Sequence, residues 1–278
     1  ARAVELLISN DQKLATGISK EINNYNNERR SVDRVITNEA MRMISEDQWT
    51  SNAKTTVLFN PSWKKGVIGI VASRLIETYY RPTVILTESN GFATGSARSV
   101  QGYDLYQAIE ACSDLLESFG GHMFAAGLTM KKENIKPFME RFESYVESTI
   151  TEDQMQPRII IDTELLFEEI NNEFFSVMSQ FQPFGPENMS PVFVSRNVYD
   201  TGSGRMVGSN GEHLKLELRQ GKGSLKSLSG IAFNQADRFE YLKNGNPIDI
   251  CYSLEMNKFR GNRSLQLNIR DIKKVSAG

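Results

Sequence analysis

Apolar residues change their spacing along this chain of 278 residues. Between about residues 11 and 150 they recur every three or four positions in several segments, with short apolar runs between these segments. After about residue 190 they alternate one by one with polar residues. The first pattern is typical of amphipathic helices and buried strands, and the second of half-buried strands. We therefore expect an α/β domain followed by an all-β domain, and the chain is long enough for both.

Residues 1–53 predict a long connecting helix. Ser9, Asn10 and Asp11 form a good helix start, because short polar side chains accept hydrogen bonds from free backbone N–H groups. An apolar stripe then runs to about Asp47, either as one helix or as two that break near Asn23. The chain starts without Met and in the middle of a pattern, so we expect it to be a piece of something longer.

Residues 54–152 predict an α/β domain, a mixed sheet with flanking helices. We expect strands at residues 55–59, 82–87, 93–98 and 123–130. The expected helices cover residues 66–80, 104–118 and 132–150. Between the second helix and the last strand, Gly120 and Gly121 predict a glycine turn that ends at His122.

Residues 153–278 predict a linker helix and a small all-β barrel. The composition shifts at residues 151–157, where we place a linker, and the pattern then suggests a strand at 159–161 and a helix at 166–181. The later strands and one helix are expected at residues 192–194, 214–218, 228–233, 234–242 (the helix), 250–254 and 265–269. Three strands, a helix and two strands is the order of an OB-fold, a barrel used to bind oligonucleotides.

The charge of the chain is unevenly distributed. Residues 191–278 hold 14 Lys and Arg against 8 Asp and Glu, whereas the remainder holds 18 against 26. This asymmetry favours an anionic partner for the C-terminal part, although a solvated basic surface explains it equally well. Cys112 and Cys251 are far apart and lack metal-ligand spacing, so we expect two reduced thiols in a cytoplasmic protein. No run of residues is long and apolar enough for a membrane span, and no signal peptide is present.

A candidate phosphate site lies between residues 95 and 130. Ser96 offers a hydroxyl, Arg98 a guanidinium that matches two phosphate oxygens, and His122 an imidazole beside the pair Gly120 and Gly121. Two glycines allow a backbone to come close to an anion. From the residues alone, the more common explanation of this pattern is an ordinary loop turn at the two glycines and a histidine with a structural role.

These residues belong to a set of motifs that resembles the DHH-associated domain of the RecJ family, single-strand-specific exonucleases of bacteria in the DHH superfamily. The motifs are Gly66-Val67-Ile68-Gly69-Ile70-Val71-Ala72-Ser73-Arg74-Leu75, Ser96-Ala97-Arg98, Tyr103-Asp104-Leu105, Cys112-Ser113-Asp114-Leu115-Leu116, Phe119-Gly120-Gly121-His122, Ala125-Ala126-Gly127 and Pro183-Phe184-Gly185-Pro186-Glu187-Asn188. They cover most of the chain in the family's order. The resemblance also implies an OB domain at residues 153–278 and supports the phosphate-binding role.

The resemblance implies an enzyme of which this chain is the substrate-binding portion. Such an enzyme hydrolyses single-stranded DNA from the 5′ end in repair and recombination, with Mn²⁺ or Mg²⁺ in an N-terminal DHH domain. The Asp-His-His signature of that domain is absent from this sequence, so we expect no metal site, no catalytic residue and no nuclease activity in this piece. The expected partners are single-stranded DNA and the DHH domain, with single-strand-binding protein and a helicase as further candidates.

Two more residues of the first domain are candidate phosphate contacts. Lys64 precedes a helix start, where free N–H groups suit an anion. Many family members have a histidine at this position, so a hydrogen bond specific to histidine is in doubt, whereas lysine can replace it as a point charge. Arg74 is as good a candidate for a surface ion pair as for a DNA contact.

The second domain carries candidate DNA contacts in two basic runs. They comprise Lys215, Arg219, Lys222 and Lys226, then Lys258, Phe259, Arg260 and Arg263. Phe259, Tyr252 and Tyr199 are aromatic candidates for base stacking, although core positions are more common for such rings.

Two other function classes fit parts of the sequence. One is a DHH-superfamily phosphodiesterase that acts on short oligonucleotides or cyclic dinucleotides, but those relatives generally end after the associated domain. The other is a non-enzymatic single-strand-binding module. The sequence upstream of this chain would distinguish them, because only the enzymes need aspartate-rich and Asp-His-His motifs.

Overall fold

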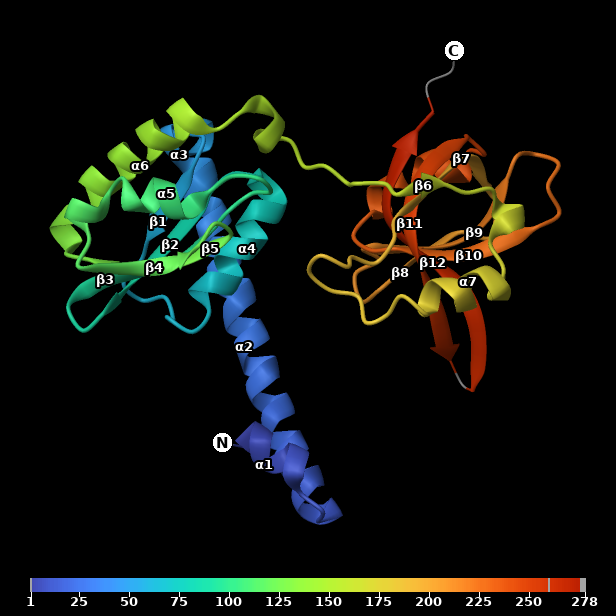
Figure 1. The fold of residues 1–278 in the computed structure, drawn as a ribbon, viewed down its shortest axis with the longest axis horizontal. Helices are drawn as coiled ribbons and strands as arrows, with labels where there is room; N and C mark the ends of the chain where they lie inside the picture. Colours follow the sequence, from blue (N-terminus) through green and yellow to red (C-terminus); the bar gives the residue numbers. More distant parts are fainter. Residues whose placement is uncertain (1, 260, 276–278) are drawn as a thin grey trace. The chain divides into compact units, whose positions relative to one another are not determined.

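The computed structural model describes residues 2–259 and 261–275 and consists of two compact units (Figure 1). Unit 1 is Ala1–Arg158 and unit 2 is Ile159–Gly278. None of the described helices is long and apolar enough to cross a membrane.

Unit 1 begins with a short helix, α1 (Arg2–Ile8), and a long one, α2 (Gln12–Glu46). Asp11 caps α2 as predicted, because its side chain accepts hydrogen bonds from the backbone N–H groups of Lys13 and Leu14. The helix is continuous past Asn23, so the alternative with two helices is wrong. Its first half is largely exposed, and its second half buries an apolar stripe against α4 (Ile68–Tyr79).

The sheet of unit 1 has five strands in the order β1-β2-β3-β5-β4. β1 and β2 are parallel and the other neighbours antiparallel, so the sheet is mixed as predicted. The strands are β1 (Thr56–Phe59), β2 (Thr83–Ser89), β3 (Phe92–Arg98), β4 (Ser118–His122) and β5 (Ala125–Met130).

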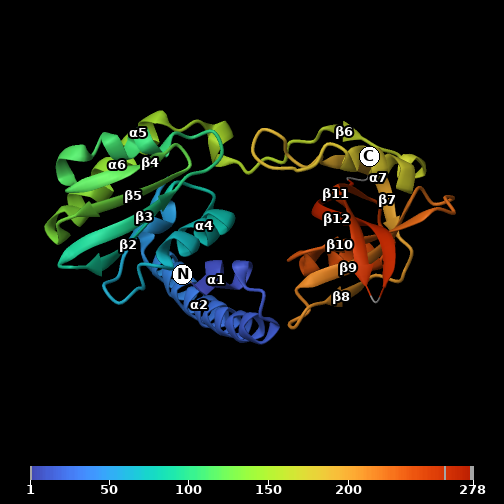
Figure 2. The same cartoon turned by 60° about the horizontal axis from the view of Figure 1, so that its bottom comes forward.

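Helices cover both faces of this sheet (Figure 2). Leu58 and Ile85 pack on one face against α2 and α4. Val84, Leu86 and Ala97 face the opposite side, where α5 (Leu105–Glu110) and α6 (Ile135–Thr149) complete a second apolar core. The short helix α3 (Gln48–Asn52) connects α2 to β1. The alternation along each strand therefore decides which side chains each helical layer meets.

Two local predictions in unit 1 are wrong. The helix expected at 104–118 ends at Glu110, and a 3₁₀ turn at Ser113–Leu115 leads into β4. Gly120 and Gly121 do not form a turn, because they lie inside β4 and pair with Gly127 and Ala126 of β5. Pairing with β5 outweighs the low strand propensity of glycine, since the sheet supplies hydrogen bonds whatever the side chain.

Unit 2 contains a seven-stranded sheet in the order β6-β7-β11-β12-β10-β9-β8. An additional pairing of β7 with β9 joins β7, β11, β12, β10 and β9 into a ring of strands. The strands are β6 (Thr163–Glu164), β7 (Phe193–Asp200), β8 (Arg205–Val207), β9 (His213–Gln220), β10 (Ser227–Ala232), β11 (Ile248–Phe259) and β12 (Asn262–Lys274).

The order of the long elements in unit 2 agrees with the sequence prediction, since α8 (Phe239–Lys243) lies between β10 and β11. The short strands β6 and β8 were not predicted. The expected strand at 159–161 is absent from the described structure. The expected helix at 166–181 is a 3₁₀ turn, Phe167–Glu169, followed by α7 (Asn172–Ser179).

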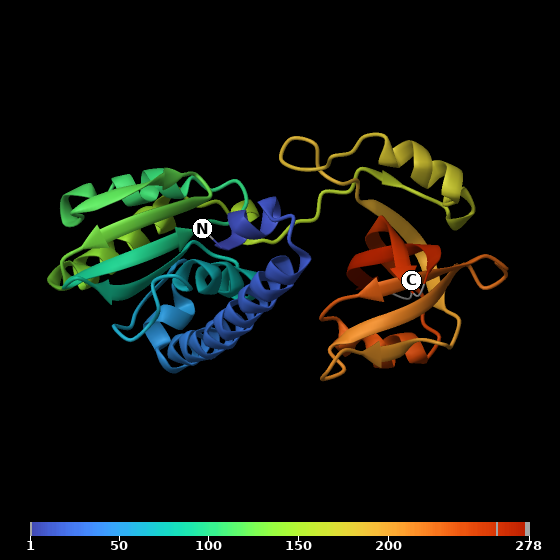
Figure 3. The same cartoon turned by 90° about the horizontal axis from the view of Figure 1, so that it is seen from below.

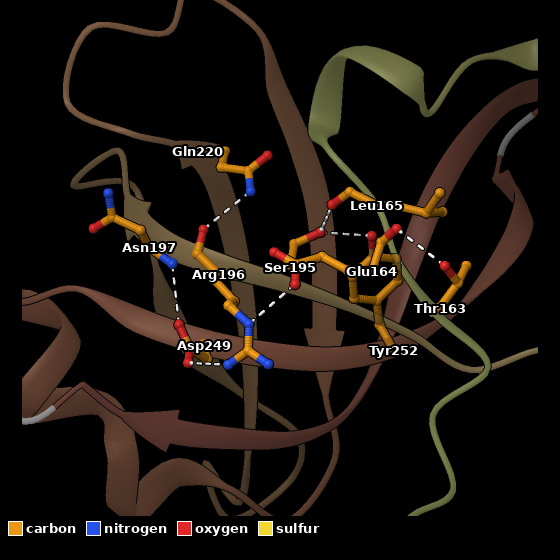
Figure 4. Close-up of polar contacts among 9 residues, drawn as sticks. All are labelled: Thr163, Glu164, Leu165, Ser195, Arg196, Asn197, Gln220, Asp249 and Tyr252. Carbon is orange, nitrogen blue, oxygen red and sulfur yellow. Dashed lines mark hydrogen bonds and ion pairs between the residues drawn. The ribbon is translucent and has the colours of Figure 1, made fainter.

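The segment before α7 is part of the core of unit 2 (Figure 4). Ser195 donates a hydrogen bond to the carbonyl oxygen of Leu165 at 2.6 Å and shares another, at 2.8 Å, with the hydroxyl of Tyr252. At the surface, Arg196 donates to Glu164 and Asp249. Tyr252 is fully buried, so of the two alternatives for this ring the structure supports the core position over base stacking. Burial also raises the pKa of Tyr252 to about 12.

Candidate nucleic-acid interface

Sheet register in unit 1 brings the predicted phosphate-binding residues onto one face. Arg98 of β3 lies opposite Ala125 of β5, which in turn lies opposite His122 of β4. Directly opposed residues in antiparallel strands project to the same face. Neighbouring strands are about 4.8 Å apart, so the backbones of Arg98 and His122 are separated by roughly 10 Å. Both side chains can reach a group that lies over β5.

The next row of the same face contains almost no side-chain atoms. It consists of Ser96, Gly127 and Gly120 from β3, β5 and β4. Added Cβ atoms at Gly120 and Gly127 would have open space around them, with only the oxygen of Gly95 near Gly127 at 3.9 Å. Packing within the chain therefore does not require either glycine, and the bare backbone is accessible from solvent. We call these two rows, Ser96, Arg98, Gly120, His122, Ala125 and Gly127, the glycine strip.

Gly121 has a different role from its neighbour Gly120. It lies in the row of Ala126 and Ala97, which are buried on the α5–α6 side of the sheet. A Cβ at Gly121 would come within 2.8 Å of the Cβ of Ala126 and still closer to its Cα. Glycine is therefore needed here for the close approach of β4 and β5, and Gly121 does not project with the glycine strip.

Arg98 is held beside the first turn of α4. Its Nη1 donates hydrogen bonds to the hydroxyl of Ser96 at 2.9 Å and to the carbonyl oxygen of Ala97 at 2.8 Å. A Cβ at Gly69 would lie 2.8 Å from Nη2 of Arg98 and 2.9 Å from Oγ of Ser96. Gly69 thus leaves the space that this guanidinium and hydroxyl occupy.

The electrostatics around Arg98 favour an anion. Among residues 2–259 and 261–275, no carboxylate forms an ion pair with this half-buried guanidinium. α4 begins at Val67 without a capping side chain, and the first N–H groups of a helix have no partner within the helix. A guanidinium beside a helix N-terminus concentrates positive charge, which a bound phosphate would neutralise.

His122 is exposed at the end of the strip. Its Nδ1 accepts a hydrogen bond from the backbone N–H of Phe124 at 3.3 Å, and its ring meets the Phe124 ring edge to face. Nδ1 as acceptor places the proton of the neutral ring on Nε2. The histidine therefore both supports the turn between β4 and β5 and presents a donor to solvent.

The two other predicted contacts in unit 1 have different surroundings. Lys64 is exposed in the loop before α4, next to Trp63, whose Nε1 donates to Glu39 at 2.9 Å. Arg74 forms an ion pair with the buried Asp33 at 2.8 Å. The structure thus supports the ion-pair alternative for Arg74, because leaving Asp33 without a counterion would be costly.

Unit 2 brings part of the first basic run together with an aromatic ring. Arg219 of β9 lies opposite Tyr199 of β7, and Nζ of Lys222 lies 5.8 Å from the centre of the Tyr199 ring. Nε of Arg219 is buried without a hydrogen-bond partner in the described part of the chain. We call Tyr199, Arg219 and Lys222 the Tyr199 cluster. It combines a stacking surface with positive charge, as single-strand-binding sites do.

The first basic run also contains Lys215 and Lys226. Lys215 is on β9 opposite Arg205 of β8. Burial lowers the pKa of Lys215, the nearby carboxylate of Glu217 partly counteracts this, and the positive charge of Arg205 lowers the pKa a little further. Lys226 instead donates hydrogen bonds to the carbonyl oxygens of Glu168 at 3.1 Å and Ile170 at 2.9 Å. It therefore anchors the turn before α7.

The second basic run is at the tip of the β11–β12 hairpin. Lys258 and Arg263 are exposed and lie opposite each other. Arg260 and the side chain of Phe259 lie outside the described residues.

The described residues contain no group of three or more His, Cys, Asp or Glu side chains that could hold a metal ion. Only His122 and His213 are available as imidazoles, and His213 accepts a hydrogen bond from the backbone N–H of Asn234. Among the described residues, the side chains therefore do not provide the cluster of ligands that a bound Mn²⁺ or Mg²⁺ would need.

Comparison with family models identifies both units. Residues 52–148 match the DHHA1 domain and residues 161–271 match the RecJ OB domain. The chain carries the DHHA1 and OB domains of the RecJ family. The glycine strip lies in the DHHA1 domain and the Tyr199 cluster in the RecJ OB domain.

Similarity to RecJ proteins extends over nearly the whole chain. The single-stranded-DNA-specific exonuclease RecJ of Bacillus subtilis is 33% identical over 97% of this chain, and that of Haemophilus influenzae 31% identical over 98%. The crystal structure of Thermus thermophilus RecJ in complex with Mn²⁺ matches 99% of this chain with a TM-score of 0.76 and 25% identity. The chain spans only 34% and 48% of the two sequence relatives and 39% of the solved chain.

Proposed function

We propose that this chain is the DNA-binding portion of a RecJ-type single-stranded-DNA-specific exonuclease. The observation that carries the proposal is Arg98, which has no counterion among the described residues and lies beside the first turn of α4 and the bare backbone of the glycine strip. A DNA phosphate would satisfy both positive groups at once. Gly120 and Gly127 would let the sugar–phosphate backbone approach the sheet closely.

Within this proposal each residue of the strip has a separate task. Arg98 presents a fork for two phosphate oxygens, with Ser96 fixing its orientation. His122 donates through Nε2 to the same or the next phosphate. Together they would fix the position of one phosphodiester relative to the catalytic centre, which lowers the entropic part of the activation barrier.

Hydrolysis itself would take place in a DHH domain outside this chain. Mn²⁺ or Mg²⁺ bound there would activate water and stabilise charge on the phosphoryl group. The Mn²⁺ complex of the Thermus thermophilus relative supports this cofactor for the family. Cleavage from the 5′ end, and partners such as single-strand-binding protein or a helicase, remain predictions.

We infer that the ring of strands in unit 2 is an OB barrel that holds the single strand further along. The Tyr199 cluster and the hairpin pair Lys258 and Arg263 supply the stacking surface and the phosphate contacts. The match to a RecJ OB domain favours this function over a phosphodiesterase for short oligonucleotides. The named exonuclease relatives favour it over a non-enzymatic module.

Fluorescence anisotropy with a labelled single-stranded oligonucleotide tests the proposal. Arg98→Met should weaken binding about tenfold and reduce the dependence on salt concentration by about one phosphate contact. Arg42→Met is the matched control, because Arg42 is an exposed residue of α2 that pairs only with Glu46 among the described residues. Equal binding by Arg98→Met and the wild-type chain would contradict the proposal.

A further inference from the structure

Unit 2 has an apolar groove that DNA binding does not explain. It lies between α7 and the loop at residues 181–191 and has a volume of about 340 Å³. Figure 3 shows α7 and this loop together in the yellow segment of unit 2. Phe174, Met178 and Phe193 form part of the lining and also belong to or pack on the core of unit 2, so the floor of the groove is fixed.

The rim of the groove exposes large apolar side chains. Val177, Phe181 and Met189 are 54%, 65% and 71% exposed. Apolar side chains gathered around a concave surface of this kind are typical of interaction sites, whereas scattered ones carry no such meaning. Methionines at such a site adapt their shape to different partners.

Hydrogen bonds hold the loop that forms one wall of the groove. The side chain of Asn188 donates to the carbonyl oxygens of Phe181 at 2.9 Å and Pro183 at 3.0 Å. Gly185 and Asn188 exchange two backbone hydrogen bonds, at 2.9 and 3.0 Å. The groove is therefore preformed, which reduces the entropy lost when a partner binds.

The charge of this segment identifies the kind of partner. Residues 159–195 contain no Lys, Arg or His, but they contain six carboxylates: Asp162, Glu164, Glu168, Glu169, Glu173 and Glu187. Of these, Glu164 forms an ion pair with Arg196, just outside the segment. A nucleic acid would be repelled by this segment. A cationic segment with an apolar stripe would match both the groove and its rim.

We propose that the groove binds an amphipathic helix of a partner protein, whose apolar stripe fills the groove and whose flanking Lys and Arg face the carboxylates. In this binding mode, apolar residues at positions i, i+3, i+4 and i+7 of the partner helix insert into the groove. This surface shares no residue with the Tyr199 cluster or the glycine strip, and its function does not depend on theirs.

The test uses the full chain and a defined probe. The probe is a fluorescein-labelled synthetic helix of about 18 residues, five turns, with a leucine stripe flanked by Lys and Arg. A second peptide keeps the stripe but carries Glu in place of each Lys and Arg. We expect the cationic peptide to bind at least about tenfold more tightly in fluorescence anisotropy.

Paired variants distinguish binding in this groove from non-specific hydrophobic binding of the peptide. Phe181→Ser with Met189→Ser should weaken binding of the cationic peptide at least about tenfold, because both side chains are exposed and their loss leaves the core intact. Met206→Ser is the matched control, since Met206 is similarly exposed on β8 and does not line the groove. Reversing Glu173 and Glu187 to Lys should move the preference to the anionic peptide.

Three outcomes would overturn the proposal. One is binding of the cationic peptide that Phe181→Ser with Met189→Ser leaves unchanged. Another is no binding of the cationic peptide by the full chain. The third is equal loss of single-stranded DNA binding in the same variant, which would assign the groove to the DNA path.

Discussion

Gly69 is the residue that most directly links packing to phosphate binding. It is in the first turn of α4, where alanine would favour the helix by up to about 1 kcal/mol. A Cβ at this position would nevertheless displace the guanidinium of Arg98 or the hydroxyl of Ser96, which lie 2.8 and 2.9 Å away. Helix propensity therefore favours alanine at this residue, whereas the proposed phosphate contact of Arg98 favours glycine.

We predict that Gly69→Ala keeps the thermal midpoint within a few degrees and weakens single-stranded DNA binding about tenfold. Gly66→Ala is the control, because nothing lies within 4 Å of a Cβ at Gly66. Calorimetry and anisotropy on both variants give the two quantities. Unchanged binding by Gly69→Ala would show that the observed position of Arg98 does not matter for DNA.

Gly120 and Gly121 are neighbours in sequence with different structural roles. Gly120→Val should leave the free energy of unfolding nearly unchanged and reduce DNA binding, because its side chain would enter only the open space above the strip. Gly121→Ala should cost about 1–3 kcal/mol, because its Cβ would collide with the backbone of Ala126. Urea unfolding of both variants measures the difference. Similar destabilisation by the two substitutions would contradict the assignment.

At the scale of the elements, the 3₁₀ turn before α7 depends on one lysine. Lys226 donates to two carbonyl oxygens of that turn, so Lys226→Met should destabilise unit 2 by about 1–2 kcal/mol. DNA binding by the folded protein should change little. Lys222→Met should behave in the opposite way, since Lys222 belongs to the Tyr199 cluster and its Nζ lies over the Tyr199 ring. Denaturant unfolding and fluorescence anisotropy on both variants measure the two effects. Loss of DNA binding in Lys226→Met, or loss of stability in Lys222→Met, would contradict this assignment.

Sequence patterns predicted helices and strands well where the local spacing of apolar and polar side chains determines the element. Asp11 and the stripe behind it predicted the start of α2, and single alternation predicted β9, β11 and β12. They failed at β4, where pairing with the next strand along the chain decided the outcome. β4 forms because β5 supplies its hydrogen bonds, and no local pattern in Gly120 and Gly121 carries that information.

For the whole molecule, two buried groups predict separate responses to alkaline pH. Burial raises the pKa of Cys112 in unit 1 from 9.0 to about 11, and that of Tyr252 in unit 2 from 10.0 to about 12. Between those values the unfolded chain loses a proton that the folded unit keeps. Stability therefore falls as pH rises, from about 9 to 11 for unit 1 and from about 10 to 12 for unit 2.

Calorimetry across this pH range should show two transitions that respond at different pH. Cys112→Ser should reduce the fall of the first transition between pH 9 and 11, and Tyr252→Phe that of the second between pH 10 and 12. Part of each fall should remain, because burial also raises the pKa of Tyr103 in unit 1 and of Cys251 in unit 2. A single transition with one common pH response would contradict the separation into two units.

The sequence by itself determined the order of most of the long elements, the change from an α/β to an all-β unit, and the residue types that can hold a phosphate. These follow from local spacing and side-chain chemistry. Only the tertiary structure decided that Arg98 and His122 share a face, that Gly69 makes room for the guanidinium, and that Lys226 and Tyr252 serve the fold. Strand register and burial depend on residues far away in the chain, so no local pattern can encode them.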